Sequence, residues 1–423
     1  MTLVSIGVSH KQAPIAVREQ LAIPGDELEA RLKKLRALPG VQEALLVSTC
    51  NRVEIFALAH SRDASQDLLH QLGPVAAGHA VTRFDDEALR HLFRVAASLD
   101  SMVVGEAQIL GQVKEAAALA QAAGALGPEL TRALQRATST ARRVRTETEI
   151  ARGAVSVSSI AVQLAHKLLG ELHGRSVLLL GAGEMAQLAA RELRQQGCAE
   201  LLVANRSPAK AEELAREVNG VPVSLAELPA LLERVDVAVC STGATSFVIT
   251  AEMMTRALKA RRYRPIFLVD LTLPRNVDPR ANELENVYVY DLDDLEGVAA
   301  QNRGLRESHV GKAEAIVEEE LKAFLQQARE RSAVPVLARL RQHAEQVAKA
   351  EVEKTLGTLR ELDEKEQKAV RAMAQAIVNK LLHAPTSRLR DEAGEGPLHD
   401  AAAELFGLAA GEAEVLPLVR KGS

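Results

Sequence analysis

Short apolar runs alternate with amphipathic stretches over residues 1–75. The runs TLVSIGV, EALLVST and RVEIFALA are typical of β-strands, whereas DELEARLKKLRAL and ASQDLLHQLG have the apolar spacing of helices. This order of strand, helix, strand, strand and helix predicts a split βαβ, ferredoxin-like unit. Residues 86–150 are rich in Ala and Leu at helical spacing, so we expect a helical subdomain that completes an N-terminal α+β domain.

The pattern changes near residue 155, where the helical stretch SVSSIAVQLAHKLLG is followed by strands and helices in alternation up to Asp291. The strand candidates are SVLLLG, ELLVAN, DVAVCST, IFLVDL and NVYVYD. Alternation of this kind predicts a doubly wound, Rossmann-like parallel sheet with helices on both faces.

The last part of the chain is helix-forming and highly charged up to about Leu382. One proline, Pro335, is the expected break between a connecting helix and a terminal helical bundle, and residues 384–399 have the composition of a loop. Because the apolar positions of this part lack a partner elsewhere in the chain, we expect these C-terminal helices to form a homodimer. The alternative is a helical bundle that closes within one subunit.

These patterns together predict a multi-domain α/β protein. The expected domains are residues 1–152, 153–295 and 296–423. Of the 423 residues, 47% are hydrophobic and only 2% are aromatic, so Leu, Val and Ala must fill the cores.

Charge and terminal sequence narrow the classes of function. The formal net charge of −4 gives no general attraction to nucleic acid or to an anionic membrane, so a polyanionic partner must use a local basic patch. The N-terminus lacks a signal-peptide pattern, and no apolar run approaches the roughly 20 residues that span a bilayer. We therefore expect a cytoplasmic protein without membrane contact. Three widely spaced cysteines indicate neither a disulfide framework nor a metal site.

A glycine-rich turn follows the first strand of the expected parallel sheet. It has the pattern G-x-G-x-x-A and consists of Gly181, Ala182, Gly183, Glu184, Met185 and Ala186. The first glycine allows a tight turn, the second lets the backbone approach a pyrophosphate, and the alanine keeps the next helix close to the strand. Between a strand and a helix the motif predicts dinucleotide binding, whereas alone it would describe a tight turn.

The end of the second strand indicates which dinucleotide binds. Asn205, Arg206 and Ser207 occupy the place where an NAD enzyme usually has an acid for the ribose hydroxyls, and Lys210 follows. A guanidinium suits a 2′-phosphate, so we expect NADP(H). A solvated turn that happens to contain an arginine is the alternative.

Cys50 lies at the end of a predicted strand, where a rigid sheet presents residues to a cleft. Arg52 is expected to lower the pKa of this thiol and to hold an anionic group of a substrate. Such a thiol, in a chain with a nicotinamide-binding domain, suggests reduction of an acyl group through a thioester. His91 is the best placed of the 11 histidines to assist, although a lone helical histidine is more often structural.

Seven stretches of the chain carry a resemblance to a known family. In order they are STCNRVEIF, HLFRVAASLDSMVVGEAQILGQVK, RRVRTETEIARGAVSVSSIAV, GAGEMAQLAARELR, ANRS, STGA and NVYVYDLDDLEGV. From Ser5 to about Arg306 the chain closely resembles glutamyl-tRNA reductases, and the terminal helical region is similar in length and character. The resemblance implies NADPH-dependent reduction of glutamyl-tRNA(Glu) to glutamate-1-semialdehyde with release of the tRNA, the first step of the five-carbon route to 5-aminolevulinate and tetrapyrroles.

The resemblance also implies roles for individual residues. Cys50 would be the acylated nucleophile, His91 the site histidine, and Arg52 the partner of the glutamyl carboxylate. The other positions that match the family's substrate-binding residues are Thr49, Asn51, Ser101, Glu106, Ala107, Gln108 and Gln112. Ala107 stands where the family commonly has proline, a departure that concerns loop stiffness more than chemistry.

The same resemblance assigns the three ranges to a catalytic domain that binds glutamyl-tRNA, an NADPH-binding domain and a dimerisation domain. Residues 1–150 balance 17 basic with 17 acidic residues, and Arg142, Arg143 and Arg145 form their densest basic cluster, so we expect this cluster to contact tRNA. The alternative is that the arginine stems on one face of this helix cover the neighbouring domain. A glutamate-1-semialdehyde aminotransferase is a further candidate partner. Two other classes stay open: an NADP-dependent oxidoreductase for a small free acid, and a nonenzymatic NADP-binding dimer.

Overall fold

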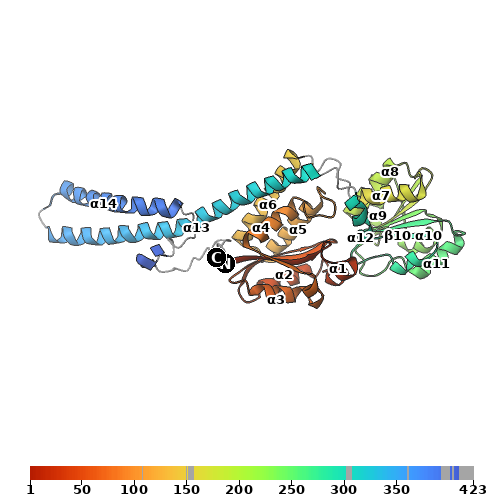
Figure 1. Ribbon diagram of the computed structural model, residues 1–423, viewed down its shortest axis with the longest axis horizontal. Coiled ribbons are helices and arrows are strands. Elements are labelled where there is room, and N and C mark those ends of the chain that lie inside the picture. Colours follow the sequence, from red (N-terminus) through yellow and green to blue (C-terminus); the bar gives the residue numbers. More distant parts are fainter. Residues whose placement is uncertain are drawn as a thin grey trace.

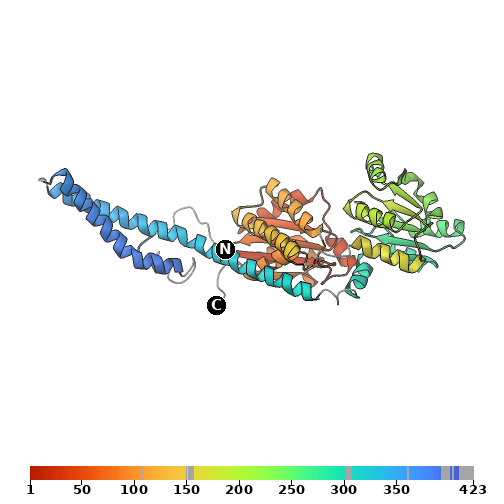
Figure 2. The ribbon, with the colours of Figure 1, turned by 90° about the horizontal axis from the view of Figure 1, so that it is seen from above.

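The computed structural model describes residues 1–106, 108–148, 150, 157–301, 307–359, 362–391, 401–402 and 404–408. Its long axis runs from a helical hairpin, through a domain with an antiparallel sheet, to a domain with a parallel sheet (Figure 1). The view from above shows the same order, so the three parts lie in a row (Figure 2).

The antiparallel sheet of the first domain has the strand order β2-β3-β1-β4. Its elements are β1 (Thr2–Ser9), α1 (Ile15–Leu21), α2 (Leu28–Arg36), β2 (Val41–Ser48), β3 (Arg52–Ala59), α3 (Ala64–Leu72), the 3₁₀-helix η1 (Pro74–Gly78) and β4 (Val81–Phe84). Strand β3 lies between β1 and β2 and runs antiparallel to both, as in a split βαβ unit. The predicted ferredoxin-like fold is therefore confirmed.

Helices cover both faces of this sheet. On the face opposite α2 and α3 lie α4 (Asp85–Ala96), α5 (Gln108–Ala122) and α6 (Pro128–Glu147), which form the predicted helical subdomain (Figure 1). Every residue of β1 and β3 is buried as a result. The sequence pattern missed α1, η1 and β4, because elements of seven residues or fewer show too little periodicity.

The second domain contains six parallel strands in the order β10-β9-β8-β5-β6-β7. Its elements are α7 (Val157–Leu169), β5 (Ser176–Leu180), α8 (Glu184–Gln195), β6 (Glu200–Ala204), α9 (Pro208–Glu217), β7 (Val221–Val223), η2 (Leu225–Glu227), α10 (Leu228–Arg234), β8 (Val237–Cys240), α11 (Ala251–Ala260), β9 (Ile266–Asp270), η3 (Pro279–Glu283), β10 (Val287–Tyr290) and α12 (Leu292–Gln301). From β7 to β10 this is the 3-2-1-4-5-6 order of a Rossmann fold, whose switch point lies between β5 and β8. The predicted doubly wound sheet is confirmed, and the pattern missed only the short strand β7.

One long helix, α13 (Glu307–Thr358), lies along the first domain and continues into the helical hairpin (Figures 1 and 2). Its residues Ala313, Val317, Leu321 and Phe324 pack into the core of the first domain, against α4 and α6. Ion pairs surround this contact: Arg90–Glu318, Arg94–Glu314, Arg136–Glu320, and Arg143 with both Glu319 and Glu320. The first part of α13 therefore belongs to the packing of the first domain.

The predicted break at Pro335 is wrong, because α13 continues through this residue as a helix. A proline inside a helix removes one backbone hydrogen bond, and here each half of α13 has its own tertiary contacts, with the first domain and with α14 (Glu364–Asp391). Residues 384–391, predicted as a loop, also continue a helix, the end of α14, whereas residues 392–400 lie outside the described residues.

Helix α14 exposes an apolar stripe. Met373, Ile377 and Leu381 follow one another at four-residue spacing and are 59%, 49% and 69% exposed. Val378 and Leu389 are instead buried. Within the part of the chain that the structure describes, no helix combines the length and the apolar character needed to cross a membrane.

Arginines in the apolar stripe of α14 should separate the expected dimer. We expect the double variant Ile377→Arg/Leu381→Arg to be monomeric, because a symmetric apolar interface offers buried guanidinium groups no counter-charge. The control Gln375→Arg/His383→Arg adds the same charges to the other flank of α14 and should stay dimeric. Light scattering measures both masses, and circular dichroism checks that the helices persist. A dimeric stripe variant would place the interface elsewhere.

Candidate active site

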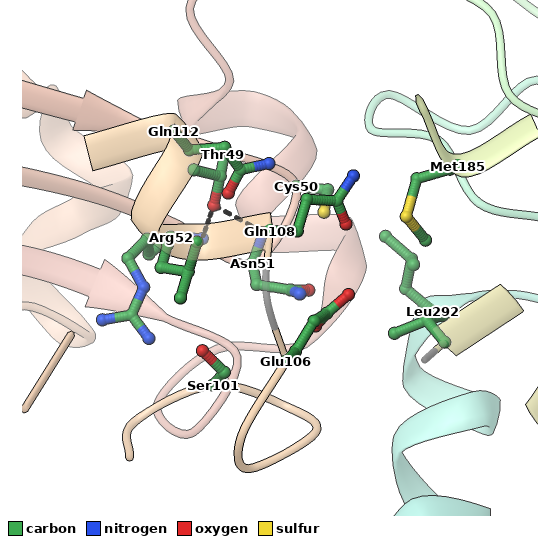
Figure 3. A pocket seen from close by; sticks show the side chains of 12 residues that line it. Thr49, Cys50, Asn51, Arg52, Ser101, Glu106, Gln108, Gln112, Met185 and Leu292 are labelled. Atoms are coloured by element: carbon green, nitrogen blue, oxygen red, sulfur yellow. Dashed lines mark hydrogen bonds between the residues drawn. The ribbon is translucent and has the colours of Figure 1, made fainter. Parts of the chain in front are cut away.

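Cys50 lies at the tip of the β2–β3 hairpin, in the loop of residues 49–51. Thr49 closes this loop: its N–H donates to the carbonyl of Arg52 at 2.8 Å, and its hydroxyl accepts from the N–H groups of Asn51 and Arg52, both at 3.2 Å (Figure 3). The N–H of His10 donates to the carbonyl of Asn51 at 2.8 Å. The loop backbone is thus fixed from both sides, and the Cys50 side chain is half-buried.

A second loop and the start of α5 bring further polar side chains to the thiol. Ser101 and Glu106 lie in the loop after α4, and Gln108 and Gln112 lie one turn apart on α5. Gly105 shapes this loop with a φ of +89°, and a Cβ there would lie 2.2 Å from a backbone carbonyl oxygen of a neighbouring segment. Only glycine fits this position, so the loop that holds Ser101 and Glu106 depends on it.

We call the cavity around Cys50 the thiol pocket. Its lining residues are Thr49, Cys50, Asn51, Arg52, Ser101, Glu106, Gln108, Ile109, Gln112, Val157, Met185 and Leu292 (Figure 3). The structure thus brings together the predicted nucleophile and every predicted substrate-binding residue that it describes, whereas Ala107 lies outside the described residues. Sequence reasoning missed Ile109, Val157 and Leu292, because an apolar side chain in a helix or at its end carries no chemical signal of its own.

Arg52 is buried with two carboxylates at the wall of this pocket. Its Nη1 lies 3.4 Å from both oxygens of Glu54 and 3.3 Å from Oδ2 of Asp100, and Lys11 also pairs with Asp100. Burial alone would raise the pKa values of Glu54 and Asp100, but neighbouring positive groups outweigh burial and bring both to about 2. Arg52 Nε and Ser101 Oγ are buried and have no hydrogen-bond partner among the described residues.

His91 does not line the thiol pocket. It lies on α4 with 4% of its surface exposed, and its Nε2 is 2.9 Å from Oε1 of Glu54. Its ring stacks on Phe56, with 6.0 Å between the ring centroids. Since Glu54 also contacts Arg52, the structure places the predicted site histidine behind the pocket wall, from which it reaches the pocket through those two residues.

Arg52 lowers the pKa of the Cys50 thiol, as expected, but other effects outweigh it. Burial raises the pKa of Cys50 to about 11, and the negative charge of Glu106 adds to this effect. Arg52 favours the thiolate only weakly, because its guanidinium is turned toward Glu54 and Asp100. Arg18 of α1 opposes the rise more strongly than Arg52 does, and its Nη1 donates to the Cys50 carbonyl at 2.6 Å.

The glycine-rich turn of the second domain lies at the switch point of the parallel sheet. Gly181 directly follows β5 with a φ of +103°, and a Cβ there would lie 1.9 Å from the carbonyl oxygen of Ser241, at the end of β8. Gly183 precedes α8 and provides no side-chain cap, so the first N–H groups of α8 are available to an anion. Ala186 is completely buried, which lets α8 pack closely on the sheet. The turn has the backbone geometry that a pyrophosphate needs.

Exposed cations stand at the end of β6. Arg206 and Lys210 are exposed, and neither has an ion-pair partner among the described residues. The N–H of Arg206 donates to Oδ1 of Asn205 at 2.8 Å, and Ser207 precedes α9 without capping it through its side chain. This edge of the sheet can therefore receive a phosphate without first breaking an internal ion pair.

The second domain meets the first at the thiol. Met185, in the first turn of α8, and Leu292, at the start of α12, line the thiol pocket from the side opposite the hairpin loop (Figure 3). Cys50, Ala182 and Met185 all pack against the same apolar cluster, most of whose residues belong to the second domain. The dinucleotide-binding turn and the thiol are therefore neighbours.

Three family models match successive parts of the chain. "Glutamyl-tRNAGlu reductase, N-terminal domain" matches residues 6–148, "Shikimate / quinate 5-dehydrogenase" matches residues 163–298, and "Glutamyl-tRNAGlu reductase, dimerisation domain" matches residues 312–408. A protein of Anaeromyxobacter dehalogenans named "Glutamyl-tRNA reductase 2" is 53% identical over 406 residues, which are 95% of this chain and 91% of that protein. The chain belongs to the glutamyl-tRNA reductase family.

Other members of the glutamyl-tRNA reductase family match over a similar length. That of Myxococcus xanthus is 48% identical over 417 residues, which are 96% of this chain and 94% of that protein. Among solved structures, glutamyl-tRNA reductase from Methanopyrus kandleri is 34% identical, with 92% of this chain and 98% of that chain covered and a TM-score of 0.47. The resemblance found in the sequence is confirmed, and the dimerisation-domain match extends it to residue 408.

The three arginines of the basic cluster at the end of α6 differ in their contacts. Arg143 pairs with Glu147 on its own helix and with Glu320 on α13. Arg142 and Arg145 are exposed and form no ion pair within the described part of the chain. Only two of the three arginines are thus free to meet the phosphates of a glutamyl-tRNA.

Removal of the Glu106 charge should make the thiol easier to ionise. In Glu106→Gln the pKa of Cys50 should fall below about 11, because the negative charge of Glu106, which opposes the thiolate, is gone. Only the thiolate is alkylated, so the pH midpoint for iodoacetamide modification of Cys50 should move to lower pH. Mass spectrometry of the Cys50 peptide gives the rate. The control Glu115→Gln, on the exposed side of α5, should leave the midpoint in place, and an unchanged midpoint in Glu106→Gln would mean that burial alone sets it.

Proposed function

We propose that the chain reduces glutamyl-tRNA(Glu) to glutamate-1-semialdehyde with NADPH and releases the tRNA, the first step of the five-carbon route to 5-aminolevulinate. The observation that carries this proposal is the composition of the thiol pocket. Cys50 of the first domain lines one side of the pocket, and Met185, in the first turn of a helix that follows the dinucleotide-binding turn, lines the other. The two alternatives account for less of the site. An oxidoreductase for a free acid gives Cys50 no role, and a nonenzymatic dimer gives none to the polar residues around it.

Cys50 is the nucleophile of the proposed reaction. Its sulfur bonds to the carbonyl carbon of the aminoacyl ester, the bond from this carbon to the ribose oxygen breaks, and the thiol proton goes to the leaving hydroxyl of the tRNA. The thioester carbon then accepts a hydride, the carbon–sulfur bond breaks, and the sulfur takes up a proton as the aldehyde leaves. NADPH, when bound, supplies the hydride.

Unpaired polar groups in the pocket wall support a place for the glutamyl group. A bound carboxylate would satisfy Arg52 Nε, and a further polar atom of the substrate would satisfy Ser101 Oγ. The remaining polar side chains that we assign to this subsite are Thr49, Asn51, Glu106, Gln108 and Gln112. His91 acts from behind, because its contact with Glu54 orients the carboxylate that holds Arg52.

The second domain fits NADPH on two grounds. The backbone at Gly181 leaves a cradle that a Cβ would fill, and Arg206 and Lys210 are unpaired cations in the described part of the chain. We assign the pyrophosphate to Gly181, Ala182, Gly183, Glu184, Met185 and Ala186, and the 2′-phosphate end to Asn205, Arg206, Ser207 and Lys210.

The proposed domain division is residues 1–152 for catalysis and tRNA binding, 153–295 for NADPH and 296–423 for dimerisation. The apolar stripe of α14 supports a homodimer through the terminal helices. We also propose a cytoplasmic location and a glutamate-1-semialdehyde aminotransferase as partner, because an enzyme that consumes the reactive aldehyde would protect it from side reactions.

Labelled glutamate tests the thioester. On incubation with glutamyl-tRNA(Glu) but without NADPH, label should stay on the wild-type protein or leave it by slow hydrolysis, because no hydride is available. Cys50→Ala should take up no label, whereas the control Cys198→Ala, which removes a buried cysteine far from the pocket in sequence, should behave as wild type. Mass spectrometry locates the label. Transfer of label to Cys50→Ala would refute the thioester.

Replacement of Arg206 tests the cofactor. A fixed guanidinium contact with a phosphate is worth a few kcal/mol, so Arg206→Ala should weaken NADPH binding roughly ten- to a hundredfold and hardly affect NADH. Arg216→Ala, at an exposed position of α9, is the matched control and should change neither affinity. Fluorescence titration gives both dissociation constants. Equal losses for the two cofactors would mean that the 2′-phosphate binds elsewhere.

A further inference from the structure

Arg18 is a buried arginine that contacts both domains. It lies on α1 and is 1% exposed. Its Nη1 donates to the carbonyl of Cys50 at 2.6 Å and lies 3.4 Å from Oδ1 of Asn51, whereas its Nη2 donates to the carboxylate of Asp293. Its Nε donates to the carbonyl of Ala13 at 3.2 Å. A single side chain thus joins α1, the loop that carries the thiol and the start of α12.

Asp293 makes this contact from the second domain. It follows Leu292, which lines the thiol pocket. Its Oδ2 accepts from the N–H of Ile15 at 2.8 Å and its Oδ1 accepts from Arg18, so α1 uses both carboxylate oxygens. Among the described residues, Asp293 provides the ion-pair carboxylate of Arg18. Withdrawal of the second domain from α1 would separate the guanidinium from this counter-charge, so the charge-assisted contact favours the docked arrangement.

The next residue of α1 forms an ion pair of reversed polarity with the same domain. Glu19 accepts from the backbone N–H, Nε and Nη2 of Arg275 at 2.7, 2.9 and 2.9 Å. Arg275 in turn lies 3.6 Å from a carboxylate oxygen of Asp291. Within the described residues Glu19 has no hydrogen bond to the thiol loop. Arg18 and Glu19 therefore both dock the second domain, but only Arg18 also holds the loop of Cys50.

We propose that Arg18 is a positioning residue for Cys50 and that, through Asp293, it couples docking of the second domain to the conformation of the thiol loop. The coupling rests on contacts alone, while its consequence for catalysis rests on the proposed function. Asp293 fixes the guanidinium so that Nη1 meets the Cys50 carbonyl, and by linkage any ligand that favours docking also favours the fixed loop. The loop of Cys50 is thus fixed when the second domain is docked and its dinucleotide-binding turn lies next to the thiol.

Three single variants separate loop positioning from docking. Arg18→Gln and Asp293→Asn break the connection to the thiol loop, whereas Glu19→Gln weakens docking at the adjacent pair and leaves that connection intact. Thioester formation, followed with labelled glutamyl-tRNA(Glu) in the absence of NADPH, should slow roughly tenfold in Arg18→Gln, because a charge-assisted hydrogen bond is lost. Asp293→Asn should slow it as well, and Glu19→Gln should slow it less than Asp293→Asn, because the contacts of Arg18 with Asp293 and with the Cys50 carbonyl stay in place.

The double variant Arg18→Gln/Asp293→Asn tests whether the two residues act as one unit. Its rate of thioester formation should be close to that of Arg18→Gln alone, because the second change removes no further contact with the thiol loop. With NADPH present, Glu19→Gln should reduce less of its thioester to aldehyde and release more as glutamate, since docking is weaker. The proposal would be overturned if Arg18→Gln formed the thioester at the wild-type rate. It would also be overturned if the double variant showed the product of the two single-variant losses in rate.

A second measurement needs neither tRNA nor NADPH and keeps the inference separate from the proposed function. If the wild-type protein formed no thioester, the proposed function would fail, but the coupling could still be read from alkylation of Cys50 by iodoacetamide at fixed pH. Asp293→Asn should raise this rate several-fold, because the second domain that covers the thiol pocket is held less firmly. An unchanged rate in a variant with wild-type thermal stability would overturn the coupling. Asp293 is partly exposed whereas Arg18 is buried, so Asp293→Asn is expected to fold even if Arg18→Gln does not, and it then tests the coupling.

Discussion

Arg52 carries a charge that the first domain encloses almost completely, and the site is arranged around its neutralisation. A buried guanidinium without partners would cost several kcal/mol, so carboxylates must reach it. Glu54 comes from the same strand and Asp100 from the loop after α4, while Lys11 and His91 contact these carboxylates in turn. The network therefore ties β3, the end of β1, α4 and the loop of Ser101 into one wall beside the thiol.

The same network explains the state of the thiol. Because Glu54 and Asp100 compensate the charge of Arg52, little of it reaches Cys50, and burial together with Glu106 raises the pKa of the thiol to about 11. At neutral pH the free protein therefore holds a protonated thiol, which alkylating agents and oxidants attack slowly. The thiol proton has to leave as the acyl group arrives. The free energy of thiol deprotonation is therefore part of the barrier to thioester formation, and the resting protein keeps the neutral thiol.

The sequence predicted the fold and much of the site because their signals are local. Strand periodicity, the glycine-rich turn and the pair Gln108 and Gln112 at helical spacing can each be read within a short window. The features of the site that the sequence did not predict depend on tertiary contacts. Arg18 and Asp293 look like charged residues of solvated helix ends, and no pattern nearby in the chain indicates that they contact each other. The raised pKa of Cys50 has the same origin, because burial raises it most and Glu106 adds to this effect, and both come from segments far away in the chain.

Helices α13 and α1 connect the first domain to its two neighbours in different ways. Apolar core residues and arginine–glutamate pairs fix the first part of α13 to the first domain, and the same helix continues into the hairpin with α14. The second domain meets the first at the thiol pocket and at the charged pairs of α1, and Ile15, Met102 and Val103 of the first domain are buried in its apolar cluster. Separation of the two domains at the thiol would therefore break the Arg18–Asp293 and Glu19–Arg275 pairs together with this apolar contact. Of the two charged side chains of α1, Arg18 is the one that also holds the loop of the nucleophile.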